Sequence, residues 1–178
     1  MARIENTPKN RKGFTIIELL VVLAVVGILA TIGVVNASQG RQRARDNERK
    51  IALEQIRVAL ELYKDQHSGQ YPCSGTCSSP SWYSSEPGDS TEYNSNWIPG
   101  LAPTYIGALP RDPLGGASSY SGNCSTRKRA YRYRSDGVEY VLLAHCSPER
   151  TILSSDPYYD TTRIAYAYKV CTPGGCDW

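Results

Sequence analysis

The sequence predicts an α+β protein in which a long N-terminal α-helix packs on a small antiparallel β-meander. A 22-residue apolar run, 14–35, is followed by an amphipathic stretch that reaches about residue 66. Three strand-like segments then lie between residues 129 and 171. Because the part after the apolar run is large enough for one hydrophobic core, we expect a single globular domain with a helical anchor.

Residues 1–13 form a basic leader. They hold four Lys or Arg side chains and one Glu, a net charge of +3. Positive charge beside an apolar helix favours the cytoplasmic side of a membrane. The whole chain has 20 Lys and Arg and 17 Asp and Glu, so removal of the leader leaves 16 of each. The overall charge therefore gives no argument for nucleic-acid binding.

The apolar run 14–35 is long enough for a membrane helix. At about 1.5 Å per residue it spans roughly 33 Å, slightly more than the hydrocarbon core of a bilayer. Glu18 is its only charged residue, and an uncompensated charge there costs about 2.5–3.5 kcal/mol. On these grounds alone, Glu18 either lies near the headgroups at the helix N-terminus or has a functional partner.

The string from Lys12 to Val22, KGFTIIELLVV, resembles the processing signal of type IV pilins and type II secretion pseudopilins. The resemblance implies a pilin-like fold, cleavage between Gly13 and Phe14 by a prepilin peptidase, and methylation of the new Phe14 amine. It also implies that Glu18 neutralises the Phe14 amine of a neighbouring subunit during filament assembly. Residues 1–13 would then be a cytoplasmic leader that is removed, 14–35 the transmembrane and filament-core helix, and 36–178 an extracytoplasmic head.

Two glycines interrupt the apolar half of the expected helix. Gly27 and Gly33 suit close helix packing in a membrane, or alternatively allow the helix to melt locally as the subunit leaves the bilayer. Many members of the family have proline where this chain has Val35. Glycine is thus the only support for local melting.

The amphipathic half of the helix is expected to end near residue 66, where Ser68-Gly69 and Tyr71-Pro72 stop it. Its apolar positions recur every three or four residues and predict one buried stripe. The stripe consists of Leu53, Ile56, Leu60 and Tyr63.

Residues 68–128 predict a long, ordered connection, because their Trp and Tyr content is unlike that of disordered segments. Within it, Leu109 to Gly115, LPRDPLG, resembles the turn that precedes the sheet in many major pseudopilins. Three strands are expected to follow within the sheet region 129–171. They are 130–134, 138–145 and 163–171, with an Asp136-Gly137 hairpin turn between the first two.

Six cysteines follow the membrane segment, and an extracytoplasmic head favours disulfides. The sequence cannot select among their 15 possible pairings, and the preferred set has two local bridges and a third that fastens the long loop to the sheet. Zinc bound at the first close pair is the alternative, although a second close pair of ligands is lacking. The preferred pairs are Cys73–Cys77, Cys124–Cys146 and Cys171–Cys176.

The sequence gives no catalytic constellation and implies no cofactor, so we do not expect an enzyme. His67 and His145 are its only histidines, and His145 and Cys146 would point to opposite faces of a strand. Asp156 and Asp160 could bind calcium, as the corresponding loop does in many major pseudopilins, but a plain turn is preferred.

A cationic segment precedes and enters the first expected strand. Alternation would place two of its arginines in solvent and Tyr131 and Tyr133 in the core. The alternative is that exposed arginines capture DNA phosphates along a filament. The cationic residues are Arg127, Lys128, Arg129, Arg132 and Arg134.

We therefore expect a subunit of a type IV pilus, first inserted in the cytoplasmic or inner membrane and then displayed in a surface filament for adhesion, motility or DNA uptake. Its partners would be copies of itself, a prepilin peptidase, and a pilus or secretion assembly platform with its ATPase. The alternatives are a pseudopilin of a type II secretion system and a membrane-anchored extracytoplasmic binding module that never polymerises.

Overall fold

A computed structural model describes residues 13–89, 92–93, 96–116, 124–125, 127–164 and 166–178. Its one long helix, α1, runs from Ile16 to Gln66 and is 51 residues long. The chain divides into two compact units, 1–40 and 41–178, and each is described by itself. The predicted leader lies outside the described residues except for Gly13.

The first unit contains the apolar start of α1. Its large side chains from Phe14 to Leu29 are half or more exposed. Among the described residues, no helix combines the length and the hydrophobicity needed to cross a membrane. The predicted membrane segment 14–35 includes positions 31–35, Gly33 among them, whose side chains lie outside the described residues, so that segment stays a prediction.

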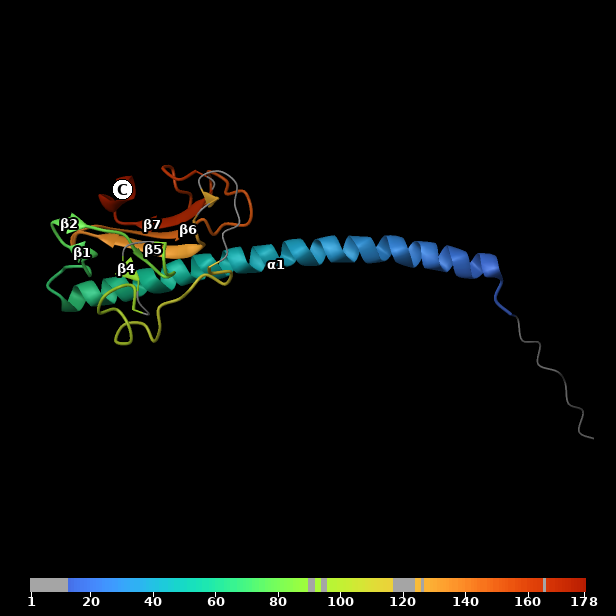
Figure 1. The fold of residues 1–178 in the computed structure, drawn as a ribbon, viewed down its shortest axis with the longest axis horizontal. Helices are drawn as coiled ribbons and strands as arrows, with labels where there is room; N and C mark the ends of the chain where they lie inside the picture. Colours follow the sequence, from blue (N-terminus) through green and yellow to red (C-terminus); the bar gives the residue numbers. More distant parts are fainter. Residues whose placement is uncertain (1–12, 90–91, 94–95, 117–123, 126, 165) are drawn as a thin grey trace, which may run out of the picture. The chain divides into compact units, whose positions relative to one another are not determined.

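The second unit, the head, contains the antiparallel meander that the sequence predicts. It consists of β5 (Ala130–Ser135), β6 (Tyr140–His145) and β7 (Ala167–Cys171). Figure 1 shows these strands side by side along the last turns of α1. Helix and meander together confirm the α+β fold class.

Short strands that the sequence analysis missed extend the sheet. β3 (Tyr83–Ser84) pairs antiparallel with β5, and β4 (Glu92–Tyr93) pairs parallel with β3. The resulting order is β4-β3-β5-β6-β7. A separate two-stranded hairpin joins β1 (Gly75–Thr76) to β2 (Ser79–Pro80).

Two predicted strands begin later than expected because side chains cap the preceding turns. Asp136 Oδ1 accepts hydrogen bonds from the N–H groups of Val138 and Glu139, at 2.9 and 2.8 Å, so β6 begins at Tyr140 rather than at 138. Asp160 Oδ1 accepts one from the N–H of Thr162 at 2.9 Å, and this turn delays β7 to Ala167 rather than 163.

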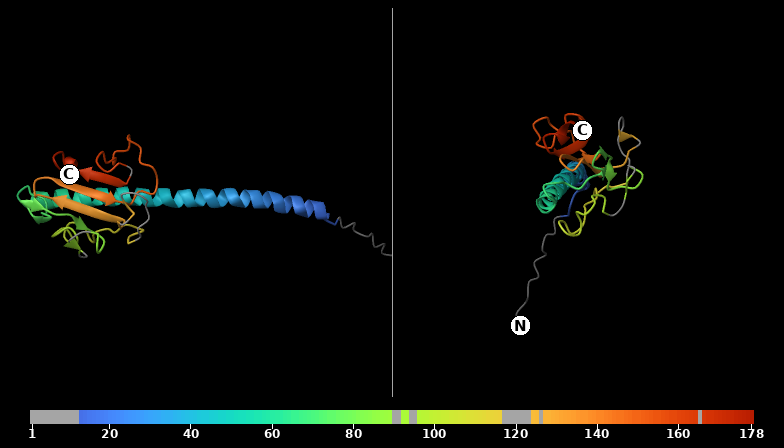
Figure 2. Two further views of the ribbon diagram at one scale, coloured as in Figure 1. Left: turned by 45° about the horizontal axis from the view of Figure 1, so that its top comes forward. Right: turned by 90° about the vertical axis from the view of Figure 1, so that its left-hand side faces the viewer.

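The helix and the sheet share one hydrophobic core, as the stripe on α1 predicts. Leu53, Ile56 and Leu60 are fully buried, and Tyr63 packs partly buried against them. Figure 2 shows the strands and the segment 97–116 lying alongside the same turns of α1. The core partners from the sheet and that segment include Tyr131, Tyr133, Leu142, Trp97, Ile98 and Leu101.

Three disulfides fasten the head, in the pairing preferred from the sequence. Cys73–Cys77 brackets β1, with one cysteine on each side of that strand, and Cys124–Cys146 joins the loop before β5 to the end of β6. Cys171–Cys176 joins β7 to the short 3-10 helix η2, Gly175–Asp177. No described cysteine is free, and no group of three His, Cys, Asp or Glu in the described part of the chain could hold a metal ion.

Candidate functional site

The first turn of α1 places Glu18 through a reciprocal pair of hydrogen bonds with Thr15. The Glu18 N–H donates to Thr15 Oγ1 at 3.3 Å, and the Thr15 N–H donates to Glu18 Oε2 at 3.4 Å. This is a capping box, which satisfies two N–H groups that the helix itself leaves unpaired. Thr15 is not among the site residues predicted from the sequence, although its Thr-x-x-Glu spacing with Glu18 is typical of a capping box.

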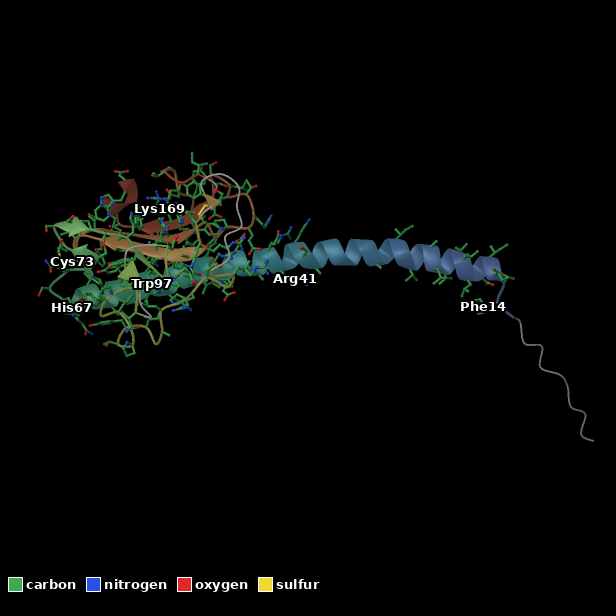
Figure 3. All side chains as sticks on the ribbon, viewed as in Figure 1. Phe14, Arg41, His67, Cys73, Trp97 and Lys169 are labelled. Atoms are coloured by element: carbon green, nitrogen blue, oxygen red, sulfur yellow. A yellow bond between two sulfur atoms is a disulfide. The ribbon has the colours of Figure 1, made fainter. Side chains whose placement is uncertain are left out.

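The first turns of α1, before and after Glu18, expose large apolar side chains. Figure 3 shows these side chains as sticks beyond Phe14, which is labelled and 84% exposed. An apolar helix of this kind has to be covered by lipid or by other protein. The large exposed side chains include Ile16, Ile17, Leu20, Leu23 and Leu29.

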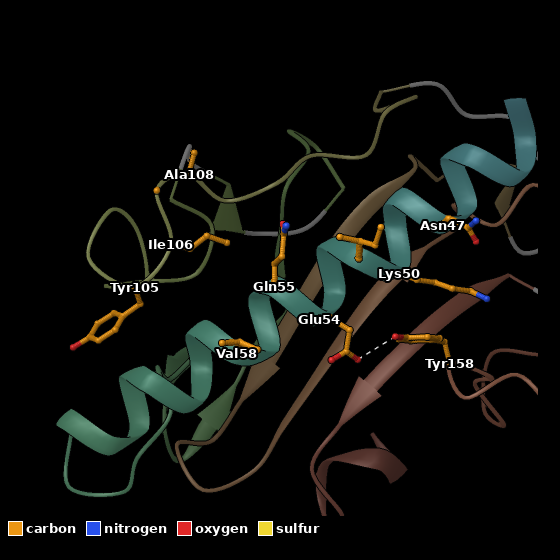
Figure 4. A pocket seen from close by; sticks show the side chains of 11 residues that line it. Asn47, Lys50, Glu54, Gln55, Val58, Tyr105, Ile106, Ala108 and Tyr158 are labelled. Atoms are coloured by element: carbon orange, nitrogen blue, oxygen red, sulfur yellow. Dashed lines mark hydrogen bonds between the residues drawn. The ribbon is translucent and has the colours of Figure 1, made fainter.

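The head presents a second apolar surface on the side of α1 that does not face the core. Ile51 and Val58 are 58% and 52% exposed there. They line an open groove of about 900 Å³ together with the segment 105–108 and Tyr158. Figure 4 shows the groove, in which the Tyr158 hydroxyl donates to Glu54 Oε1 at 3.2 Å.

A buried cluster of charges ties α1 to the LPRDPLG turn. The Arg49 side chain is fully buried and donates to Asp112 through Nε at 2.8 Å and through Nη2 at 3.0 Å. Its Nη1 donates to Asp46 and Glu149, each at 2.9 Å. Arg45 also donates to Glu149, and these hydrogen bonds outweigh burial and lower the pKa of Glu149 to about 2. The LPRDPLG turn, which the sequence predicts as a bend, thus also binds α1 through Asp112.

The prediction that the strand arginines are solvated is wrong. Arg132 is 7% exposed, and its Nε and Nη2 donate to Asp89 at 2.7 and 2.6 Å. Arg134 lies over the rings of Trp82 and Trp178, at 5.9 and 5.0 Å from their centroids. The two arginines find partners in distant segments, which strand alternation alone could not reveal.

The other members of the cationic segment do not form an exposed row either. Lys128 Nζ donates to the Pro87 carbonyl at 2.5 Å, and Arg129 is 7% exposed and 3.9 Å from Glu149. Of the five cationic residues only Arg127 is exposed. Tyr131 and Tyr133 are buried in the core as predicted.

The two calcium candidates are occupied by cationic side chains. Asp156 accepts from Lys50 Nζ at 2.5 Å. Asp160 accepts from Lys169 at 2.9 Å and from Arg163 at 3.1 Å, and these contacts lower its pKa against the effect of burial. The structure therefore favours the turn over the calcium site.

Neither histidine belongs to a nucleophilic site. His67 follows the last residue of α1, stacks on Tyr63 at 3.7 Å and hydrogen-bonds the Tyr63 carbonyl through Nδ1 at 2.8 Å. His145 is 4% exposed and lies beside Cys146, whose sulfur is already bonded to Cys124. A disulfide sulfur carries no thiolate, so a Cys146 nucleophile is excluded.

His145 should make the head sensitive to mild acid. Burial, followed by the charge of Arg132, lowers its pKa from 6.5 to about 3, with Arg127 and Arg163 adding to the effect and Asp89 opposing it. The unfolded chain therefore binds a proton first as the pH falls, and stability is complete above pH 6.5 and lost toward pH 3. Between pH 6 and 5 we expect the free energy of unfolding to fall by about 1.4 kcal/mol per pH unit.

Denaturant unfolding of the full-length protein in detergent, followed by tryptophan fluorescence, measures this slope. The His145→Gln variant cannot bind the proton and should give a flat profile over the same pH range. An equally flat profile for the unsubstituted protein would contradict the prediction.

Comparisons with known proteins agree with the motif at the helix start. The family described as "Prokaryotic N-terminal methylation motif" matches residues 8–34. The type II secretion system core protein G of Klebsiella pneumoniae is 32% identical over 110 residues, which are 60% of this chain and 71% of that protein. No solved structure matches the chain significantly.

Two pilins match over shorter regions. The type IV major pilin protein PilA of Myxococcus xanthus is 39% identical over 64 residues, 34% of this chain and 29% of that protein. The type IV wide pilus major component PilA4 of Thermus thermophilus is 50% identical over 56 residues, 32% of this chain and 43% of that protein. The match thus spans less than half the length of either pilin.

Proposed function

The chain belongs to the family of type IV pilins and type II secretion pseudopilins, and we propose that it is a structural subunit of a type IV pilus. The subunit enters the cytoplasmic or inner membrane as a precursor. A prepilin peptidase removes residues 1–13, the Phe14 amine is methylated, and an assembly platform with its ATPase adds the subunit to a filament of identical copies. The finished filament lies on the cell surface, where it serves adhesion, motility or DNA uptake.

The observation that carries this proposal is the start of α1. Gly13 and Phe14 precede a capping box that holds Glu18, and the following turns expose large apolar side chains. A carboxylate and an amine are each costly in an apolar surrounding and offset one another when they meet. In the proposed filament the Glu18 carboxylate of one copy meets the Phe14 amine of another.

A large head with local disulfides suits a subunit that is displayed outside the cell. Disulfides persist in oxidising surroundings and are rare in the cytosol. Within the described residues, all cysteines are paired in disulfides. The head is therefore suited to an oxidising place outside the cytoplasm, as a surface filament requires.

Electron microscopy of filaments sheared from cells that express the chain at its native level tests the proposal. We expect long filaments whose main protein is this chain, and mass spectrometry should find a mature N-terminus at Phe14 that carries a methyl group. Short filaments confined to the cell envelope would contradict a pilus. A chain that keeps residues 1–13 would contradict the processing.

The second candidate is a pseudopilin of a type II secretion system. Two observations favour it: the match to a core protein G covers more of the chain than the pilin matches, and the LPRDPLG turn is anchored through Asp112. Deletion of the chain's gene separates the candidates. Loss of secreted enzymes with no change in surface filaments would favour the pseudopilin.

A membrane-anchored binding module that never polymerises is the alternative from a different class. Such a module needs α1 only as an anchor, so it should tolerate loss of the Glu18 charge. The DNA-uptake role has little support from the strand arginines, because Arg132 is buried against Asp89.

A further inference from the structure

A cationic hollow of about 400 Å³ lies on the head, away from the apolar groove. Four separate parts of the chain contribute to it: the segment before β3, the loop before β5 with β5 itself, the end of β6, and the turn before β7. Its lining residues are Trp82, Arg127, Arg132, His145, Arg163 and Tyr166. Arg127 and Arg132, from the loop before β5 and from β5, meet Arg163, from the turn before β7, at this hollow.

Arg132 forms the fixed part of the hollow. Its Nε and Nη2 are held by Asp89, so the guanidinium is locked in one orientation. Its Nη1 donates to none of the described residues. A buried guanidinium with unused donors is ready to bind a further acceptor.

Arg127 supplies a solvent-exposed cation at the same hollow. Its backbone N–H donates to the Cys124 carbonyl at 3.3 Å, next to the disulfide with Cys146. Its side chain makes no hydrogen bond or ion pair with any residue that the structure describes. The charge of Arg127 is therefore available to a ligand.

Arg163, from the turn before β7, is the third arginine of the hollow and is held in place by three contacts. Nη1 donates to Asp160 at 3.1 Å, Nη2 donates to the Trp178 carbonyl at 2.9 Å, and the guanidinium lies 5.3 Å from the centroid of the Trp82 ring. Asp160 is shared with Lys169, which lies 2.9 Å away. The Asp160 carboxylate thus pairs with both Arg163 and Lys169.

The charges around the hollow do not balance. Three arginines line the hollow, and the carboxylates that pair with them are Asp89 and Asp160, of which Asp160 also accepts from Lys169 outside the hollow. His145 adds no proton near neutral pH, because burial and the three arginines of the hollow lower its pKa to about 3. The electrostatic potential in the hollow is therefore positive, which favours the binding of an anion.

We propose that this hollow binds a single oxyanion, namely the carboxylate, sulfate or phosphate group of a small polar molecule or of an acidic sugar. Guanidinium groups present paired donors that match such oxygens, and charge-assisted hydrogen bonds are the stronger kind. The cations surround one concavity rather than forming a row, so a single group fits better than the extended backbone of a nucleic acid. The proposal does not depend on assembly into a filament.

The test is isothermal titration of the unassembled full-length protein in detergent, in a low-salt Tris buffer at pH 7, with inorganic phosphate and with glucuronate as separate probes. We expect saturable binding of at least one probe to one site. Preference for phosphate would indicate a free anion, and preference for glucuronate would indicate a sugar acid. Added salt should weaken the binding.

Two variants make the test specific. Arg127→Gln removes one exposed charge at the hollow and should weaken binding about tenfold or more. Arg150→Gln removes one exposed charge outside the hollow and should leave the affinity for the probe unchanged. The proposal is overturned by absence of binding, by equal binding in the two variants, or by a DNA duplex that binds the hollow more tightly than both probes.

Discussion

Replacement of Arg49 by alanine is expected to destabilise the head by about 3–5 kcal/mol. The Arg49 side chain is fully buried and binds Asp112, Asp46 and Glu149. Its removal leaves the Asp112 carboxylate, which is also fully buried, without its ion-pair partner. Because a whole domain is stable by only about 5–15 kcal/mol, this loss removes a large share of the stability of the head.

Denaturant unfolding, with the fluorescence of buried Trp97 as one reporter, measures the effect. Arg57→Ala is the matched control, since Arg57 pairs with Glu54 at 2.7 Å but both side chains are more than a third exposed. An exposed pair of this kind contributes about 0.5 kcal/mol. Equal losses of unfolding free energy in Arg49→Ala and Arg57→Ala would show that the buried charge cluster does not anchor the LPRDPLG turn.

Replacement of Glu18 by alanine is expected to abolish filament formation while leaving cleavage after Gly13 intact. Without the carboxylate, the incoming subunit brings an uncompensated Phe14 amine into an apolar core, which costs several kcal/mol. Sheared filaments should fall by at least about tenfold, whereas the mature chain still accumulates in the membrane fraction. Immunoblots of the sheared fraction and of the membrane fraction measure the ratio of assembled to unassembled mature chain.

The capping box allows the charge of Glu18 to be separated from its structural role. Glu18→Gln keeps a side chain that can accept from the Thr15 N–H but removes the charge, so it should fail like Glu18→Ala. Thr15→Ala removes the cap at a cost of about 1 kcal/mol and keeps the charge, so filaments should still form. Normal filaments from Glu18→Gln would contradict the pairing of the Glu18 charge with the Phe14 amine.

The sequence predicted those parts of the fold whose signals are local. The stripe of Leu53, Ile56 and Leu60 follows helical periodicity, and Asp136-Gly137 marks a hairpin, so the helix face and the β5–β6 pair could be anticipated. β3 could not, because a strand of two residues has no periodicity. Its pairing with β5 joins positions far apart in the chain, and only tertiary packing specifies that contact.

The charged contacts were beyond sequence reasoning for a related reason. Arg132 is 43 positions from Asp89, and Arg49 is 63 positions from Asp112. Alternation along a strand assigns a face to a side chain but does not say whether another segment covers that face. The helix start was different, since Gly13, Phe14 and Glu18 lie within one short motif, and even the missed Thr15 belongs to a pattern within one turn.

The disulfide between Cys124 and Cys146 has a consequence for a chain under tension. The bond closes a span of 22 positions that includes all of β5 and β6. A filament that is pulled transmits force along its subunits. In a subunit without this bond, the ends of that span could move apart by roughly 70 Å as it straightened. With the bond in place, this span cannot extend even if β5 and β6 separate. Tension along the chain then passes through the disulfide from Cys124 to Cys146 and does not load the two strands between them.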